Sequence, residues 1–187
     1  MRVLAISGSL REDSHNTRLL RLAAERAPAG VEVAVWDGLR AIPPYDQDDD
    51  RGDGPLAVRG LRDAIASADA LLFATPEYNS SIPGVLKNAV DWASRPRASA
   101  ALAGKPAAVI GATTGSFGAV WAQAELRKVL GSAGARVIDA ELAVARAHEA
   151  FEESGVPRDP SVPERLREIL TALRSEGEHD RALPAAA

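Results

Sequence analysis

The stretch that decides the fold is residues 75–92, TPEYNSSIPGVLKNAVDW. The fully apolar run at 70–74 precedes it and predicts a buried strand, and Pro83 marks the expected start of a helix behind it. An aromatic and several polar residues therefore follow directly on the carboxyl end of a strand. Because an open α/β sheet binds its ligand in the crevice at such strand ends, the stretch predicts a site for a flat ligand with polar edges.

Outward from this stretch, strand and helix signals alternate along the chain. Short apolar runs predict strands at 3–6, 31–36, 70–74, 106–112 and 135–142. Apolar residues at helical spacing predict helices at 16–27, from 55, at 83–94, at 119–130 and from 161, where Ser161 and Glu164 have the spacing of a capping box. Strands that alternate with helices need right-handed crossovers, so the predicted class is α/β, a parallel sheet covered on both faces.

Length and composition restrict the classes of function. The 187 residues suit one domain, expected over 1–175, with a flexible C-terminal tail over 176–187. A formal net charge of -4 gives no basic footprint for nucleic acid, and the lack of cysteine excludes disulfides, thiolate nucleophiles and iron–sulfur clusters. The first residues, MRVLAISGSL, lead straight into a strand pattern, and no apolar run approaches the roughly 20 residues of a membrane span. We therefore expect a cytoplasmic protein with no membrane partner.

The first strand-to-helix turn, GSLREDSHNT at 8–17, is rich in hydrogen-bond donors. Hydroxyl groups, an amide, the guanidinium of Arg11 and the N–H groups of a helix start together suit a phosphate. The turn lacks the further glycines of a dinucleotide fingerprint and the Gly-Lys-Ser/Thr of a P-loop. Ser14 or Asn16 acting only as a helix cap is the alternative, and His15 is expected on the surface.

A third polar turn, TTGSFG at 113–118, follows the fourth strand. Its glycines allow a close backbone approach, and Gly115 is a candidate for a positive φ; an ordinary turn is the alternative. The three turns would meet at one edge of the sheet, at the switch point between the first and third strands.

At this point the chain resembles a known family. The motifs G-S-L-R-x-x-S-x-N at 8–16 and T-P-E-Y-N-x-S-x-P-G-x-L-K-N-A-x-D-W at 75–92 are similar to those of the NADPH-dependent FMN reductases, which include bacterial quinone, azo-dye and chromate reductases. The likeness covers about the first 140 residues. It implies a flavodoxin-like fold, a five-stranded parallel sheet of order 2-1-3-4-5 between two layers of helices.

The resemblance also implies the cofactor, FMN, and residues around it. The FMN phosphate would be held by Ser9, Arg11, Ser14, Asn16 and Thr17. The isoalloxazine would be lined, largely through backbone groups, by Pro76, Glu77, Tyr78 and Asn79. The pyrimidine side of the ring would be contacted by Thr114, Gly115 and Ser116.

The activity implied is hydride transfer from NADPH or NADH to FMN N5, and then to a quinone, azo compound, metal oxyanion or free flavin in a ping-pong cycle. The cofactor performs this chemistry, so no catalytic side chain and no metal is expected. The resemblance further implies a homodimer or homotetramer with the third and fourth helices at its interface. The apolar residues that these helices would present, each of which has a core position as its alternative, are Val85, Leu86, Trp92, Trp121 and Leu126.

Two other functions compete with the reductase. A flavodoxin-like electron carrier would bind FMN without oxidising NAD(P)H, although the modest charge counts against a carrier that docks on basic partners. A non-catalytic nucleotide-binding domain is the other alternative. The acidic residues at 46–50 are expected to form a solvated loop rather than a metal site. Arg146, His148 and Glu149 either border the site from a neighbouring subunit or, as we favour, are surface charges.

Overall fold

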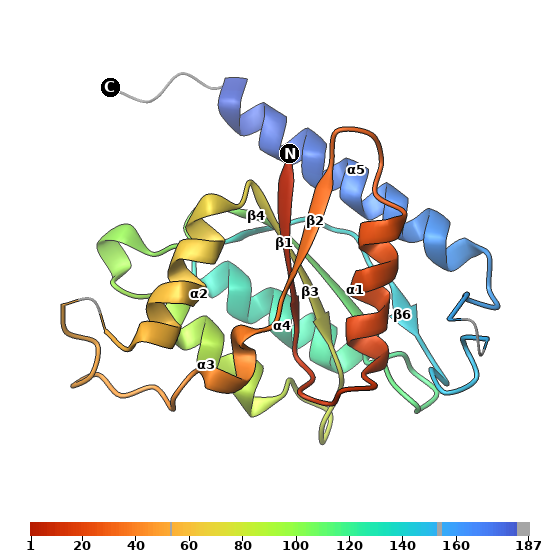
Figure 1. The fold of residues 1–187 in the computed structure, drawn as a ribbon, viewed down its shortest axis with the longest axis horizontal. Helices are drawn as coiled ribbons and strands as arrows, with labels where there is room; N and C mark the ends of the chain where they lie inside the picture. The colour runs from red at the N-terminus through yellow and green to blue at the C-terminus, as the bar shows by residue number, and fades with distance from the viewer. Residues whose placement is uncertain (53, 153–154, 183–187) are drawn as a thin grey trace.

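The computed structural model describes residues 1–52, 54–152 and 155–182, and in it a parallel sheet lies between helices (Figure 1). Its strands are β1 Arg2–Ser7, β2 Glu32–Trp36, β3 Ala70–Thr75, β4 Pro106–Ala112, β5 Arg136–Val137 and β6 Ala143–Val144. Its helices are α1 His15–Glu25, α2 Leu56–Ser67, α3 Gly84–Ala93, α4 Val120–Ser132 and α5 Ser161–Ala182, with short 3-10 turns η1 Gly38–Ala41 and η2 Arg97–Ser99.

The strand order is β2-β1-β3-β4-β5, with β6 paired to the far end of β4. All the pairings are parallel. The predicted flavodoxin-like order is therefore confirmed. The order places the carboxyl ends of β1, β3 and β4 next to one another, so the three polar turns meet at one edge.

Two apolar clusters, one on each face, hold the layers together. Leu4 and Ile6 belong to the cluster shared with α2, α3 and α4, whereas Val3 and Ala5 belong to the one shared with α1 and α5. Each side chain of β3 is buried, as expected for a central parallel strand covered on both sides. Burying a leucine-sized side chain contributes about 1.5–3 kcal/mol, so the clusters supply the main stabilisation.

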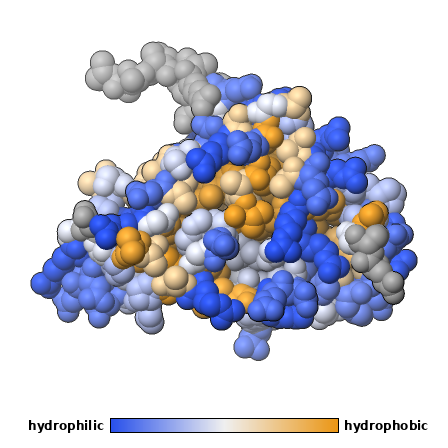
Figure 2. Space-filling model, in the orientation of Figure 1, coloured by the Kyte–Doolittle hydropathy of each residue, from blue (hydrophilic) through white to orange (hydrophobic). Residues whose placement is uncertain are grey.

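The edge strand β2 contains no buried residue, whereas every residue of the central strands β3 and β4 is buried. In the view of Figure 2, apolar residues gather near the middle of the face, where Figure 1 shows β2, and hydrophilic residues surround them. β2 contains Val35, whose side chain is exposed.

The prediction of one continuous fifth strand at 135–142 is wrong. On the side of β4 away from β3, two short strands pair with opposite ends of β4: β5 with Pro106 and Ala107, and β6 with Gly111 and Ala112. Between them the guanidinium of Arg127, on α4, donates to the carbonyl of Ala140 at 3.0 Å and to that of Val109, on β4, at 3.4 Å. The carbonyl of Val109, in the middle of β4, thus accepts from a side chain where a continuous strand would have donated a backbone N–H.

The C-terminal helix also differs from its prediction. α5 begins at Ser161, but the cap is Asp159, whose carboxylate accepts the N–H of Ser161 at 2.9 Å. Hydrogen bonds from Ser161 lower the pKa of Asp159. The helix continues to Ala182, beyond the start of the tail expected from 176, and residues 183–187 of that tail lie outside the described residues.

The second half of the decisive stretch anchors the loop after η1. Asn88 accepts the N–H of Tyr45 at 2.7 Å and donates to the carbonyl of Pro43 at 2.7 Å. The indole N–H of Trp92 donates to the same carbonyl at 2.9 Å, and its ring packs edge-on against Tyr45. These residues of α3 therefore build the fold rather than a ligand site.

The acidic loop at 46–50 forms ion pairs. Asp50 pairs with Arg62 at 2.8 Å, and both side chains are largely buried. Asp48 pairs with Arg51 at the surface. Within the described part of the chain, His, Asp and Glu side chains do not form a group of three or more suited to a metal ion, and no helix has the length and apolar character to cross a membrane.

Candidate functional site

The turns after β1, β3 and β4 enclose a cavity of about 150 Å³ at the carboxyl edge of the sheet. Its lining residues are Ser9, Arg11, Ser14, His15, Asn16, Pro76, Glu77, Tyr78, Ala112, Thr113 and Thr114. Most of the residues named from the sequence are thus brought together. Thr17, Asn79, Gly115 and Ser116 are not in the lining: Thr17 donates its hydroxyl proton to Ser7 at 2.9 Å, and the other three are exposed.

The first two turns approach each other closely because residue 8 is glycine. The N–H of Gly8 donates to the carbonyl of Ala74 at 2.8 Å. A Cβ at position 8 would lie 2.8 Å from Leu86 Cδ2 and 3.3 Å from Pro76 Cδ, so a larger residue would separate the two turns.

The first turn has the donors that an anion requires. Ser14 caps α1 by accepting the N–H of Thr17 at 3.3 Å, which leaves the N–H groups of His15 and Asn16 without an acceptor among the described residues. Arg11 is exposed, and its guanidinium has no ion-pair partner in the described chain. A helix start with free N–H groups beside an unpaired cation fits a phosphate dianion.

The side chain of Asn16 has a different role from the expected one. It is 3% exposed, and it donates to the carbonyl of Ala112 and accepts the N–H of Ala112, both at 2.9 Å. Its amide therefore joins the start of α1 to the end of β4 and does not cap the helix. For an anion, Asn16 offers its backbone N–H.

His15 lines the cavity, whereas it was expected on the surface. Its Nδ1 is buried and has no hydrogen-bond partner in the described part of the chain. Burial lowers the pKa of His15, and the charges of Arg18, Arg11 and His148 lower it further. The sequence contained no local signal for this, because Phe151, against which the ring stacks, lies far along the chain.

The turn after β3 is a tight hairpin. Tyr78 and Ser81 exchange backbone hydrogen bonds of 3.0 and 3.1 Å, and both residues between them have positive φ, 53° at Asn79 and 60° at Ser80. This is the geometry of a type I′ turn. It leaves the Tyr78 side chain 49% exposed beside the cavity.

The carboxylate of Glu77 bonds to another element. Its Oε2 accepts the N–H groups of Trp121 and Ala122, each at 3.1 Å, in the first turn of α4. Glu77 Oε2 is therefore engaged by α4, and the backbone of Glu77 stays available for the ring contact expected from the sequence.

The turn after β4 bonds to the segment after β6. The N–H of Arg146 donates to the carbonyl of Gly115 at 2.9 Å, and the N–H of Ala147 donates to that of Thr113 at 2.9 Å. Arg146 has a positive φ of 44°, which is uncommon in a non-glycine residue. The segment with Arg146, His148 and Glu149 therefore borders this turn within the same chain.

The positive φ expected at Gly115 occurs instead at Gly118, at 61°. A Cβ there would lie 2.6 Å from the carbonyl carbon of Ala143, so β6 packs directly against this backbone. The close approach favours glycine at 118 rather than at 115.

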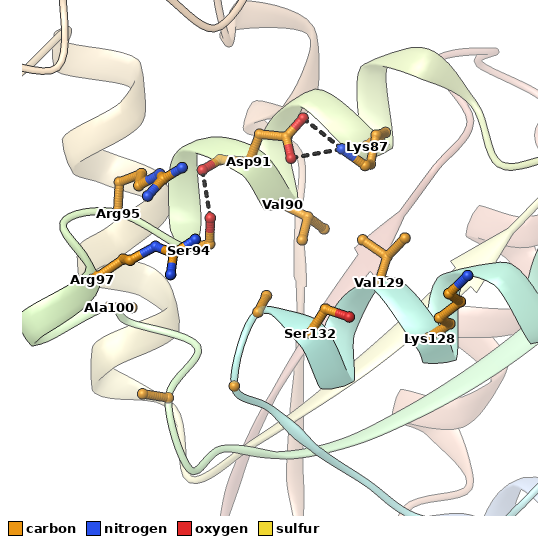
Figure 3. A pocket seen from close by; sticks show the side chains of 13 residues that line it. Lys87, Val90, Asp91, Ser94, Arg95, Arg97, Ala100, Lys128, Val129 and Ser132 are labelled. Carbon is orange, nitrogen blue, oxygen red and sulfur yellow. Dashed lines mark hydrogen bonds and ion pairs between the residues drawn. The ribbon is translucent and has the colours of Figure 1, made fainter. Parts of the chain in front are cut away.

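Larger hollows lie away from this edge. One of about 420 Å³ runs between α3 and α4, where Lys87 and Asp91 pair at 2.7 Å and Lys128 and Ser132 face them (Figure 3). Another of about 690 Å³ lies between the loop at 45–51 and residues 95–97. Neither is formed by strand ends, where an open α/β sheet binds its ligand, so we assign the site to the smaller cavity.

Three of the residues expected at a subunit interface belong to the core. Leu86, Trp92 and Leu126 are completely buried within the single chain, which confirms the alternative, that they are core positions. Val85 and Trp121 are 39% and 48% exposed and remain available to a partner.

A parallel sheet of this order, with an anion turn and two further polar turns at its carboxyl edge, defines a flavodoxin-like mononucleotide-binding protein. The family model for NADPH-dependent FMN reductase matches residues 1–149, and the chain belongs to this family.

Known proteins agree with this assignment. The chain is 42% identical over 175 residues to an NAD(P)H-dependent FMN reductase of Pseudomonas aeruginosa, covering 93% of this chain and 94% of that protein. It is 45% identical over 129 residues to a 2-hydroxy-1,4-benzoquinone reductase of a Burkholderia species, covering 69% of each. A solved structure of a flavoenzyme NAD(P)H:(acceptor) oxidoreductase from Paracoccus denitrificans superimposes with a TM-score of 0.82 at 35% identity, over 95% of this chain and 97% of that one. The chain is thus an oxidoreductase that uses FMN and NAD(P)H.

Arg11 and Asn16 make separable contributions at this site. We expect Arg11→Ala to weaken FMN binding by roughly 1.5–3 kcal/mol, as for a charged hydrogen bond, with unchanged stability of the FMN-free protein. Asn16→Ala leaves two buried backbone groups without partners, so we expect a loss of about 2–4 kcal/mol in the free energy of unfolding without FMN. Fluorescence titration and urea unfolding measure the two quantities. Arg21→Ala, on the exposed side of α1, is the control, and wild-type FMN affinity in Arg11→Ala would refute the phosphate assignment.

His15 predicts a pH dependence of stability. Its folded-state pKa lies below the ordinary 6.5, so the unfolded chain takes up a proton that the folded chain refuses. The free energy of unfolding should therefore fall as the pH is lowered from about 6.5. In His15→Phe this component is absent, and the melting temperature of the FMN-free protein should fall less between pH 7.5 and 5.5 than in the wild type. Equal falls in both proteins would exclude His15 as the source.

Proposed function

We propose that this protein is a quinone reductase that holds FMN across the cavity at the carboxyl edge. The observation that carries the proposal is the cavity itself, with unpaired donors at the start of α1 at one end and the exposed Tyr78 at the other. The proposed FMN contacts are Ser9, Arg11, Ser14, Asn16, Thr17, Pro76, Glu77, Tyr78, Asn79, Thr114, Gly115 and Ser116. FMN is larger than the cavity of about 150 Å³, so it would extend over the exposed residues at its rim.

The residues of the chain would bind FMN and orient its ring. Arg11 and the free N–H groups of α1 would hold the phosphate, and the rigid turn at Tyr78 would support the ring through its backbone. Bound FMN supplies the hydride chemistry, accepting from NAD(P)H and donating to the acceptor. The open surface beside Tyr78 offers one face to planar substrates, so we propose that NAD(P)H and the acceptor use this face in turn, in ping-pong order.

The relatives support a quinone as the acceptor, because several are named quinone reductases, including one from Escherichia coli at 40% identity. Azo compounds, metal oxyanions and free flavin are the alternative acceptors. An FMN electron carrier is the alternative function, but the likeness to a flavodoxin from Pseudomonas aeruginosa, at 19% identity and a TM-score of 0.60, shows the fold alone. We further propose a single FMN-binding domain over 1–175, and the cytoplasmic location stays a prediction.

The spectrum of the purified protein tests the function. We expect a flavin spectrum that bleaches within seconds of anaerobic NADPH addition and returns when 1,4-benzoquinone is added. Initial rates at several benzoquinone concentrations should give parallel double-reciprocal lines. A yellow protein that NADPH and NADH both fail to bleach would indicate the carrier, and a protein that cannot be loaded with FMN would rule out both functions.

We also propose that the enzyme is a homodimer or homotetramer that uses the starts of α3 and α4. Exposed apolar side chains gather there: Val85 is 39%, Val120 39%, Trp121 48% and Phe117 62% exposed. The Phe117 and Trp121 rings contact each other, with centroids 5.0 Å apart. Single exposed apolar residues are common, but a group on neighbouring helices is typical of an interface.

Substitution of Trp121 tests this interface. Trp121→Asp should reduce the mass measured by light scattering after size exclusion to that of a smaller species, with little change in the far-UV circular dichroism. Leu56→Asp is the matched control, because Leu56 is an exposed apolar residue, 75% exposed, at the start of another helix. A monomeric wild type, or a Trp121→Asp protein of wild-type mass, would count against the proposed interface.

A further inference from the structure

The helix that follows the turn at 113–118 has no cap of its own. The residue before α4, Ala119, has a left-handed φ of 62° and no side chain that can accept a hydrogen bond, and the first turn contains no acidic residue. The first N–H groups of a helix carry partial positive charge and need acceptors. The N–H groups of Trp121 and Ala122 obtain theirs from the carboxylate of Glu77, at 3.1 Å each, although Glu77 lies 44 residues before Trp121.

A second contact joins the same two elements in the opposite direction. Glu125, one turn further along α4, accepts the N–H of Ile82 at 3.4 Å. Glu77 lies near the beginning of the turn after β3, and Ile82 lies at its end. The turn after β3 and the helix α4 are therefore joined at two points, of which the Glu77 contact is the shorter and the doubly bonded one.

The same helix also holds the turn that leads into it. Gln123 is 2% exposed and donates to the carbonyl of Gly118 at 2.9 Å. The turn at 113–118 is thus tied to α4, and α4 is tied through Glu77 to the turn after β3. Pro76 and Tyr78, the neighbours of Glu77, line the cavity opposite Thr113 and Thr114.

We propose that Glu77 is a positioning residue for the flavin ring: by capping α4, its carboxylate fixes the distance between the two turns that flank the ring. The carboxylate itself points to the helix and leaves the ring contact to the backbone on either side. This inference rests on the proposed function, because it assumes that the ring lies between these turns. Loss of the cap would let the turns separate, which weakens FMN binding and changes the environment of the bound ring.

Three substitutions of Glu77 separate the effect of its side-chain length from the effect of its negative charge. Glu77→Ala removes the cap, Glu77→Asp keeps the charge but shortens the side chain, and Glu77→Gln keeps its length and its oxygen acceptor. We expect FMN binding to weaken about tenfold in the alanine and aspartate variants and to stay within about threefold of the wild type in the glutamine variant. The midpoint potential of bound FMN should shift in Glu77→Ala and Glu77→Asp and should equal the wild-type value in Glu77→Gln.

Asp159→Ala is the matched control, since it removes the cap of α5, which does not join the two turns. It should lower the melting temperature but leave FMN affinity and potential unchanged. Wild-type FMN affinity and potential in either shortened variant, measured below its melting temperature, would overturn the inference; should Glu77→Ala not fold, Glu77→Asp decides. FMN binding is measured without turnover, so a wild type that binds FMN but is not reduced by NAD(P)H would overturn the proposed function and leave this test valid.

Discussion

The site depends first on the two hydrogen bonds between the side chain of Asn16 and the backbone of Ala112, both 2.9 Å long. β3 ends at Thr75, which pairs with Gly111, so the next residue of β4 has no strand neighbour on that side. The chain turns away at Pro76, which has no N–H to donate. The amide of Asn16 takes the place of the missing residue and, in doing so, fixes the start of α1 against the end of β4. The proposed phosphate-binding turn is thereby held in a fixed position relative to the end of β4.

The buried serine, threonine, asparagine and glutamine side chains gather at this edge of the molecule. Among the described residues, the buried polar ones are Ser7, Ser14, Asn16, Thr75 and Gln123, all from strand ends or helix starts around the cavity. An unsatisfied polar group in such a place costs about 1–3 kcal/mol. Most of their polar atoms are hydrogen-bonded, but Gln123 Oε1 has no partner in the described part of the chain. The hydroxyl of Thr75, for example, donates to the carbonyl of Pro76 at 2.8 Å. The turns are therefore held by hydrogen bonds within the protein.

Local patterns predicted the elements that bury a continuous apolar face. β3, expected at 70–74, covers Ala70–Thr75, and the strand order followed from the family resemblance. The prediction of a continuous fifth strand was wrong because the guanidinium of Arg127, on the preceding helix, donates to backbone carbonyls that strand pairing would have used. In the candidate site, the residue types were enough to predict the three turns. They were not enough to predict which groups the side chains of these turns bond to. The contact of Asn16 spans 96 residues and that of Arg146 depends on where the chain returns after β6, and no local spacing encodes either.

The length of the motif at 75–92 has a physical explanation in these contacts. A turn that only touched a flavin ring would constrain a few backbone positions. Here Glu77 must also cap α4, residue 79 must tolerate a positive φ of 53°, and Trp92 must donate to the loop at Pro43. Each requirement restricts one position through the structure of the protein rather than through the ligand. Because asparagine tolerates the left-handed region better than most residues, it suits position 79 whatever the ligand is. The motif thus reflects how the turn after β3 is held within the protein. For this reason it identifies the family clearly but leaves the electron acceptor open.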